Sequence, residues 1–388
     1  MWFFTSPKIA FGEDSLEQLS SIEGKRVLII TDPIVSKLGM LEDVTNELKK
    51  QPRVVEVFDR VEPEPSFENV EKVAAAMRRF QPDLIVALGG GSCIDAAKGA
   101  WVLYERPDLT LDSVSPLTKL DLRKMARLVA IPTTAGTGSD ATWVAVLTDK
   151  SQNMKLDYFA SRELVPDYSI LNPKFLLKLP KQATAYTGLD AIDQGIEAYV
   201  SQWRNDFADS LALRSIQILF EYLPKAYDNP DDMVARQKTQ NAATMSGLAF
   251  GNSQVGLAHA TGHALGAIFH MAHGLAVGIS NPYVIQFSSR DAVQLYSDIA
   301  HAIGIKEESA KEATEMLVES IKKLMVRLNI PLSLRDAGVS QSAFDENLTT
   351  LIEQTGRSTC TFVDPRVPDT EEIRKLFLCL YNGNPVDF

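Results

Sequence analysis

The sequence predicts two domains: an α/β domain with a parallel sheet over residues 1–180 and an all-helical domain over residues 181–388. Up to Leu179-Pro180, short β-branched runs alternate with stretches of helical apolar spacing. Beyond that point the strand signals fade and long helical patterns follow. Strands that alternate with helices are typical of a doubly wound sheet with parallel strands.

The elements of the first domain follow from its apolar patterns. Three short apolar runs end at polar or glycine residues and are expected to be buried parallel strands, namely Lys25–Asp32, Asp83–Leu88 and Leu128–Thr133. Between the first two runs, Glu42–Lys50 and Phe67–Phe80 have the apolar spacing of helices.

The second domain contains long stretches in which apolar residues recur every three to four positions, as in amphipathic helices. The expected helices are Ala185–Gln202, Asp206–Ala226, Asp231–Phe250, Gln294–Ala302, Glu308–Leu328 and Thr370–Tyr381.

Composition excludes several classes of function. The net charge is −11, from 39 basic and 50 acidic residues, so neither nucleic acid nor an anionic membrane is an expected partner. The three cysteines form no Cys-x-x-Cys pair, which favours a reducing compartment. The N-terminus lacks the basic and long apolar regions of a signal peptide, and no uncharged apolar run approaches the length of a membrane span. We therefore expect a cytoplasmic protein.

A glycine-rich turn, Gly89-Gly90-Gly91-Ser92, follows the second predicted strand and opens a helix. Such a turn lets backbone N–H groups approach a phosphate, and the helix N-terminus adds partial positive charge. Ser92 is a candidate for both the helix N-cap and a phosphate ligand. The alternative is a tight connection between strand and helix with no ligand.

Two further features favour a nucleotide site. Pro132–Ser139 places hydroxyls and glycines behind another strand, where they can line a pyrophosphate and a ribose. Asp32 ends the first predicted strand, where a carboxylate accepts ribose hydroxyls and repels a 2′-phosphate, which favours NAD over NADP. The alternative for Asp32 is a turn-forming role before Pro33.

Four of the five histidines lie within fifteen residues, at His259, His263, His270 and His273. Imidazole is the commonest metal ligand among side chains, so the crowding indicates a metal or proton-transfer site, with chance clustering on a helix face as the alternative. His259 and His263 are four residues apart and share a helix face.

An unbroken helix would separate His259 from His273 by about 21 Å, too far for one ion. A shared metal therefore requires a break in the helix, for which Gly266 and the His273-Gly274 step are candidates. His270 and His301 are expected to be structural or surface residues. A zinc peptidase would need glutamate directly after His259, where the chain has alanine.

Asp190 offers the anionic ligand that a cysteine-free Fe²⁺ or Zn²⁺ site needs. It lies among apolar residues, where an unpaired carboxylate is costly, although a helix N-cap role would also explain it. Asp193 and Glu197 are expected on a solvated face of the same helix.

These motifs, in this order, resemble the iron-containing (type III) alcohol dehydrogenases over nearly the full length. The resemblance implies the dehydroquinate synthase-like fold of that family, with NAD(P) and substrate between the two domains. The segments that carry it are Thr31-Asp32, Glu62–Ser66, Gly89–Lys98, Ile131–Ser139, Thr187–Glu197, His259–Gly274 and Asp364-Pro365-Arg366.

The resemblance also implies roles for single residues. It places Asp32 at the adenosine ribose and Lys155 near the nicotinamide ribose. The other residues implied at the cofactor, along its pyrophosphate and beyond, are Gly90, Gly91, Ser92, Asp95, Thr133, Thr134 and Thr137.

The implied metal ligands are Asp190, His259 and His273, with Gln194 at the fourth position and His263 as a proton relay in the substrate pocket. In the family chemistry, a divalent ion lowers the pKa of the alcohol, and hydride then passes to the nicotinamide.

Two positions depart from the family pattern. Gln194 stands where the family has a histidine ligand, and an amide oxygen binds metal more weakly than imidazole does. The site is therefore expected to be three-ligand, to hold its metal loosely, or to prefer Zn²⁺ to Fe²⁺. Asp140 stands where many members have glutamate.

The sequence thus predicts a metal-dependent oxidoreductase that acts on a small primary alcohol, a polyol or the corresponding aldehyde, with NAD favoured over NADP. The resemblance implies a homo-oligomer, a dimer or larger. A zinc enzyme similar to the glycerol dehydrogenases, which also lack that histidine, and a metal-independent reductase of the same fold are alternatives. A catalytically reduced nucleotide- or metal-binding protein is an alternative of another class.

Overall fold

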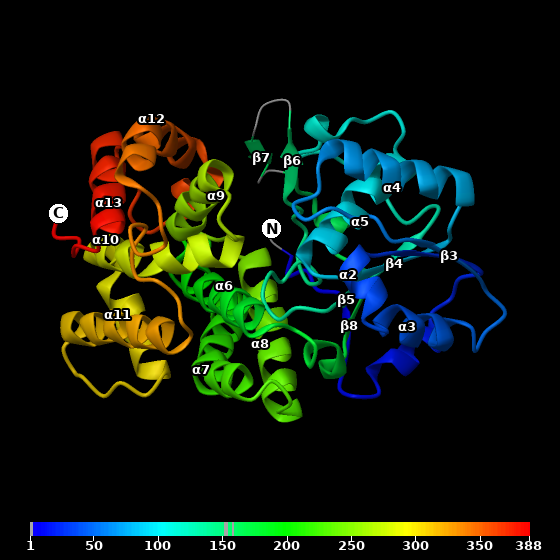
Figure 1. The fold of residues 1–388 in the computed structure, drawn as a ribbon, viewed down its shortest axis with the longest axis horizontal. Coiled ribbons are helices and arrows are strands. Elements are labelled where there is room, and N and C mark those ends of the chain that lie inside the picture. Colours follow the sequence, from blue (N-terminus) through cyan, green and yellow to red (C-terminus); the bar gives the residue numbers. More distant parts are fainter. Residues whose placement is uncertain (1–2, 151–153, 157–158) are drawn as a thin grey trace. The chain divides into compact units, whose positions relative to one another are not determined.

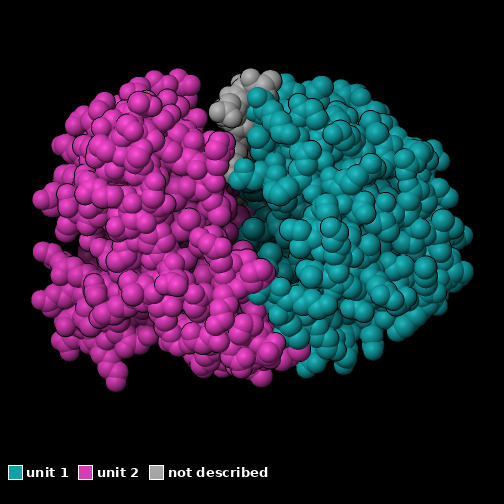
Figure 2. Space-filling view, in the orientation of Figure 1, with its two compact units in different colours: residues 1–179 teal, residues 180–388 magenta. Residues whose placement is uncertain are grey.

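The computed structural model describes residues 3–150, 154–156 and 159–388, with only the backbone for residues 154–156. The chain forms two compact units, Met1–Leu179 and Pro180–Phe388, which Figure 2 distinguishes by colour. Among the described helices, none has both the length and the apolar character that crossing a membrane requires.

The first unit is built on a parallel sheet. Among its described residues, six strands pair in the order β1-β8-β5-β4-β2-β3, and each neighbouring pair is parallel. The strands are β1 (Lys8–Phe11), β2 (Arg26–Ile30), β3 (Val54–Phe58), β4 (Leu84–Gly89), β5 (Arg127–Pro132) and β8 (Tyr168–Leu171), beside a separate antiparallel pair, β6 (Leu147–Asp149) and β7 (Met154–Leu156). The predicted strands correspond to β2, β4 and β5.

Helices cover both faces of this sheet (Figure 1). They are α1 (Gln18–Ser21), α2 (Pro33–Lys37), α3 (Met40–Leu48), α4 (Phe67–Phe80) and α5 (Gly91–Glu105), with short 3₁₀ turns at Ser15–Glu17, Leu111–Ser113, Arg162–Leu164 and Pro173–Leu176. Leu28 and Ile30 of β2 pack with α4 and α5, whereas Val27 and Ile29 pack with α1, α2 and α3. This alternation follows the two-residue period of a strand.

The strand order creates a topological switch point at one edge of the sheet. β2 and β4 are neighbours, yet β2 leads to α2 on one face and β4 leads to α5 on the other. Such a switch point, beyond the carboxyl ends of parallel strands, is where α/β sheets bind ligands. Asp32, the glycine-rich turn and Pro132–Ser139 all follow strands at this edge, as the sequence predicts.

The described part of the second unit is helical throughout. Its helices are α6 (Lys181–Val200), α7 (Asp206–Asp228), α8 (Met233–Gly251), α9 (Leu257–Phe269), α10 (His273–Ala302), α11 (Ala310–Arg327), α12 (Gln341–Arg357) and α13 (Thr370–Asn382), with a 3₁₀ turn at Thr359–Val363. The α/β and all-helical fold classes are thereby confirmed. α6 packs against α7, α8 and α10, and residues 188–200 of α6 are all buried.

Candidate functional site

Polar residues lie in the buried centre of the second unit, along α6. Asp190, Gln194 and Glu197 recur every three to four residues, so they share one face of the helix. Asp193 and Glu197 are 0% and 2% exposed, which contradicts the expected solvated face. Asp190 is 1% exposed and is the tenth residue of α6 rather than its N-cap.

The helix that carries the first two clustered histidines ends before the last one. His270 adopts a left-handed conformation (φ 53°) and ends α9, and α10 begins at His273. Neither predicted break is correct, because Gly266 lies inside α9 and His273-Gly274 are the first two residues of α10; the chain reverses at residues 270–272 instead. This reversal returns His273 to the side of His259, where their ring centroids are 5.5 Å apart.

Close packing of backbones brings α10 against α6. A Cβ atom at Gly274 would lie only 2.1 Å from the carbonyl oxygen of Tyr186 and 3.2 Å from the Cβ of Asp190. Only glycine permits this approach, and the neighbouring residue His273 thereby reaches Asp190.

The side chains of Asp190, His259 and His273 converge on one point. The Oδ1 atom of Asp190 is 3.4 Å from the Nε2 atom of each histidine, and the three ligand atoms lie within 4.8 Å of one another. Asp190 Oδ1 is buried and has no hydrogen-bond partner. A buried carboxylate oxygen that makes no hydrogen bond and faces two imidazole nitrogens fits a divalent cation, because one carboxylate and two imidazoles are ligands that such ions take.

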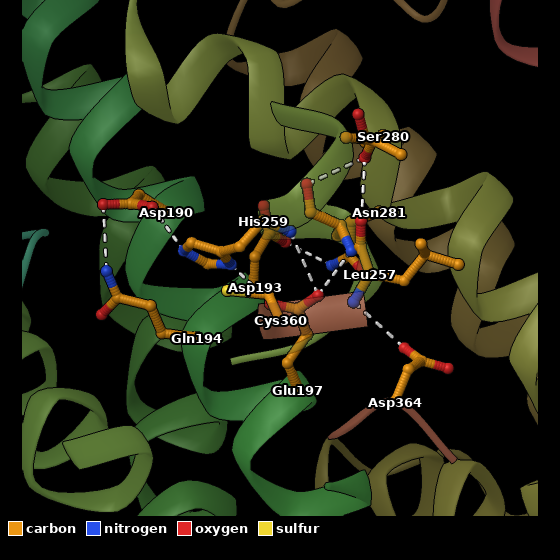
Figure 3. Close-up of polar contacts among 12 residues, drawn as sticks. Asp190, Asp193, Gln194, Glu197, Leu257, His259, Ser280, Asn281, Cys360 and Asp364 are labelled. Carbon is orange, nitrogen blue, oxygen red and sulfur yellow. Dashed lines mark hydrogen bonds and ion pairs between the residues drawn. The ribbon is translucent and has the colours of Figure 1, made fainter. Parts of the chain in front are cut away.

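Glu197 holds His259 from the opposite side. Its Oε2 atom accepts the Nδ1–H of His259, which leaves Nε2 facing Asp190 (Figure 3). Its Oε1 atom accepts backbone N–H groups of Ala258 at 2.6 Å and His259 at 3.3 Å. Asp364 accepts the N–H of Leu257 at 3.2 Å, so two buried carboxylates cap the first turn of α9. Carboxylate–histidine pairs of this kind orient metal-binding imidazoles.

Burial disfavours the charged forms of Asp190, Asp193 and His259, and the neighbouring groups decide the direction of each pKa shift. The imidazoles of His273 and His259 outweigh burial and hold the pKa of the Asp190 carboxyl well below its usual range. The carboxylates of Glu197 and Asp190 likewise outweigh burial and raise the pKa of His259 to about 10. For Asp193, burial dominates and raises the pKa well above its usual value. A cation at Asp190 would therefore compete with a proton for His259.

Gln194 lies beside Asp190 but presents its nitrogen. Its Nε2 atom donates to Asp190 Oδ2 at 3.0 Å, and its Oε1 atom lies 3.1 Å from the Ser246 hydroxyl, which the Ala243 carbonyl oxygen also approaches at 2.8 Å. The sequence predicts this residue as a ligand through its oxygen, and that oxygen is engaged by Ser246.

The other histidines divide into one near the cluster and two outside it. The partly buried ring of His263 stacks on that of His273, with centroids 5.3 Å apart, and meets His259 edge-on at 6.0 Å. His270 and His301 are exposed, as the sequence predicts.

In the first unit, the two loops predicted to bind nucleotide touch each other. A Cβ at Gly91 would lie 2.9 Å from the Thr137 side chain, and one at Gly90 would lie 3.4 Å from Thr134. Thr133 is 5% exposed and begins the second loop directly after β5. Gly90 is the N-cap of α5, so the predicted N-cap role of Ser92 is wrong; its hydroxyl accepts the N–H of Glu64 at 3.3 Å.

Two carboxylates form hydrogen bonds in and around the two predicted nucleotide loops. Asp32 caps α2, since its Oδ1 atom accepts the N–H groups of Ile34 and Val35 at 2.7 and 2.9 Å. Its Oδ2 atom faces the Cys93 thiol at 3.4 Å. Asp95 accepts the Ser139 hydroxyl and, at 3.0 Å, the N–H of Val146, so it ties α5 to the loop after β5.

Two other sequence positions lie nearby. Asp140 is buried and accepts the Ser169 hydroxyl of β8 at 2.7 Å. Lys155 belongs to β7, where it pairs with Thr148, and its side chain lies outside the described residues.

Sequence reasoning missed two buried residues. Glu197 is three residues from Gln194, and this three-to-four spacing with Asp190 was the available signal for a shared helix face. Lys98 is fully buried, and its ammonium donates to the carbonyl oxygens of Thr142 at 2.8 Å and Val144 at 2.7 Å. Burial lowers the pKa of Lys98 to about 8, although nearby carboxylates oppose the shift.

Comparison with known families accounts for both units. Residues 6–173 match the model of iron-containing alcohol dehydrogenase, and residues 184–381 match the C-terminal model of the same family. The chain belongs to the iron-containing alcohol dehydrogenase family. Redox exchange between an alcohol and its aldehyde with NAD(P), predicted from the sequence, is the reaction of this class of enzyme.

Individual relatives in this family align with nearly the whole chain. A protein named NADPH-dependent butanol dehydrogenase from Clostridium saccharobutylicum is 36% identical over 391 residues, with 100% of both chains covered. A solved 1,3-propanediol oxidoreductase matches with a TM-score of 0.91 and 30% identity, covering 98% of this chain and 100% of its own. An iron-containing alcohol dehydrogenase from Thermococcus thioreducens matches with a TM-score of 0.90 and 30% identity, covering 99% and 100%.

Some relatives are longer proteins. The chain spans 44% of the bifunctional aldehyde-alcohol dehydrogenase AdhE of Escherichia coli (strain K12), with 35% identity over 397 residues and 95% of this chain covered.

Proposed function

We propose that this protein transfers a hydride between a small primary alcohol or polyol and NAD(P), with a divalent metal held by Asp190, His259 and His273. One observation carries the proposal: a buried carboxylate oxygen without a hydrogen bond faces two imidazole nitrogens 3.4 Å away. Three protein ligands are the donor set of a catalytic site, which keeps a position open for substrate.

The chain's own residues then have distinct tasks. Glu197 keeps the Nδ1–H tautomer of His259, so that Nε2 is available as a ligand. His263 stacks on His273 and is partly buried, so it is placed to relay the hydroxyl proton of the substrate away from the cluster. A metal bound there supplies Lewis acidity, which polarises an alcohol or carbonyl oxygen.

The first unit provides the residues for nucleotide binding. The N-terminus of α5 and the loop after β5 present backbone N–H groups and threonine hydroxyls at the carboxyl edge of the sheet. These groups suit a pyrophosphate, which we assign to Gly90, Gly91 and Ser92. The cytoplasmic location and the homo-oligomeric state stay predictions from the sequence.

The proposal is tested with purified protein that has been treated with a chelator and then supplied with Fe²⁺ or Zn²⁺. We expect alcohol-dependent reduction of NAD or NADP, measured at 340 nm, only after metal is restored. Activity restored by Zn²⁺ alone would favour the alternative similar to the glycerol dehydrogenases. Full activity without metal would favour a metal-independent reductase. Metal and nucleotide binding without turnover of any small alcohol or aldehyde would contradict the proposal.

Cofactor choice depends, in our proposal, on Asp32. Its Oδ1 atom is occupied by the α2 cap, whereas Oδ2 meets only the weak Cys93 S–H donor at 3.4 Å and keeps a further lone pair for a ribose hydroxyl. We expect Asp32→Gly to raise the ratio of kcat/KM for NADP to that for NAD about tenfold or more, because a charge that repels the 2′-phosphate is removed. One relative of similar length is named as NADPH-dependent, so the preference needs measurement.

Asp32→Ser serves as the matched control, because serine keeps the helix cap and removes only the charge. Both variants should shift the ratio equally. An unchanged ratio in Asp32→Ser would assign Asp32 to the cap alone.

A further inference from the structure

The amide of Gln194 links two buried side chains in the second unit. Its nitrogen lies 3.0 Å from Asp190 Oδ2, one helical turn away on α6, and its oxygen lies 3.1 Å from the Ser246 hydroxyl of α8. Gln194 and Ser246 are 2% and 0% exposed, so bulk water does not compete for these contacts. Figure 3 shows the amide nitrogen pointing to the carboxylate and the amide oxygen pointing away from it.

Hydrogen-bond chemistry fixes this orientation. A metal-binding carboxylate is ionised and can only accept hydrogen bonds, so a carbonyl oxygen 3.0 Å from Asp190 Oδ2 would be repelled. The amide group has one oxygen and one nitrogen, and the nitrogen is the atom that the carboxylate can bind. While the nitrogen donates to Asp190, the oxygen of the same amide is directed away from the carboxylate, toward Ser246.

The two oxygens of Asp190 consequently face different partners. Oδ2 accepts from Gln194, whereas Oδ1 faces Nε2 of His259 and of His273. Rotation of the carboxylate would break the buried bond to Gln194 and leave its amide N–H without an acceptor. That penalty holds Oδ1 toward the two imidazoles.

We propose that Gln194 is a positioning residue, which fixes the Asp190 carboxylate through its Nε2–H and contributes no ligand atom to the metal. The proposal rests on the metal site of the proposed function and replaces the sequence prediction that Gln194 is itself a ligand. The protein then offers three ligands, and the remaining coordination positions belong to water or substrate.

A count of bound waters tests the proposal on the wild-type protein. Mn²⁺ takes about six ligands, so a site with three monodentate protein ligands leaves about three exchangeable waters, whereas ligation by Gln194 would leave about two. Water-proton relaxation of Mn²⁺ bound to the metal-stripped protein distinguishes these numbers. A count of two would overturn the proposal while leaving the metal site itself intact.

Variants give an independent readout with Co²⁺ as the probe. Gln194→Met removes the donor and nearly preserves side-chain length. We expect the visible absorption bands of bound Co²⁺ to keep their positions and intensities, because its ligands are unchanged. We expect the Co²⁺ affinity to fall about 10- to 100-fold, as for other residues that orient ligands.

Ser246→Ala is the matched control, because it releases the amide oxygen and retains the bond to Asp190. It should change the Co²⁺ affinity less than about threefold. Altered Co²⁺ absorption bands in Gln194→Met would overturn the proposal. Unchanged Co²⁺ affinity in a Gln194→Met protein that keeps the wild-type circular dichroism and melting temperature would also overturn it. Absence of Co²⁺ and Mn²⁺ binding to the wild-type protein would overturn the metal site and this proposal together.

Discussion

Asp190→Ala is expected to abolish metal binding and to lower kcat/KM for alcohol oxidation by about 10³-fold or more, because polarisation by a metal ion contributes several kcal/mol. Asp190 Oδ1 is the carboxylate oxygen that faces both His259 and His273. Removing it leaves the proposed metal site with two imidazole ligands and no carboxylate ligand. Affinity for NAD should change by less than about twofold, since the proposed nucleotide loops lie in the other compact unit.

His259→Ala should behave in the same way. Metal content by elemental analysis, steady-state kinetics and nucleotide titration measure the three quantities. Asp298→Ala is the matched control: it removes a carboxylate of the same unit that accepts from Tyr199 rather than facing the histidines. It should retain metal and turnover. Full activity in both Asp190→Ala and His259→Ala would place the metal site elsewhere.

Gly274→Ala is expected to lower the free energy of unfolding by about 1–3 kcal/mol or more and to weaken metal binding, although it touches no proposed ligand. The new Cβ would lie 2.1 Å from the carbonyl oxygen and 2.7 Å from the carbonyl carbon of Tyr186. Both atoms belong to the backbone of α6, so α10 must move away. His273 is the preceding residue and would move from Asp190 with it.

Gly356→Ala is the control for this effect. A Cβ there would lie 3.6 Å from Ile373 Cδ1, an ordinary contact, and alanine favours the helix that surrounds it. We expect unchanged or slightly higher stability and unchanged Co²⁺ affinity. Urea unfolding and Co²⁺ titration measure both variants. If Gly274→Ala binds Co²⁺ with wild-type affinity, the contact between Gly274 of α10 and the α6 backbone does not position the metal site.

The sequence anticipated elements whose burial produces a clear pattern. Phe67–Phe80 was predicted to the residue because one face of α4 packs on the sheet, and the predicted strands are the central β2, β4 and β5. Edge strands β1 and β3 are half exposed and lack a long apolar run. The first half of α10 is buried on nearly all sides, so it has no polar face to mark it as a helix.

The sequence predicts the site residues that belong to rare types, such as histidine. It does not predict site residues whose contacts come from distant parts of the sequence. A cluster of histidines and a buried aspartate pointed to Asp190, His259 and His273, which the structure brings together. The reversal at His270 could not be inferred, because a left-handed histidine has no sequence signal comparable to glycine. The prediction of a solvated Glu197 is wrong, because its partner His259 lies 62 positions away in the sequence.

Glu197 also ties folding to metal occupancy. One of its oxygens holds the imidazole of His259, and the other holds the first backbone amides of the helix that carries this histidine. Fraying of that first turn therefore releases the ring from its orientation, and a metal that keeps the ring in place opposes fraying. By thermodynamic linkage, metal binding should slow hydrogen exchange at the amides of Ala258 and His259. Metal release and the opening of this helix end are, on this geometry, two linked equilibria, each of which favours the other.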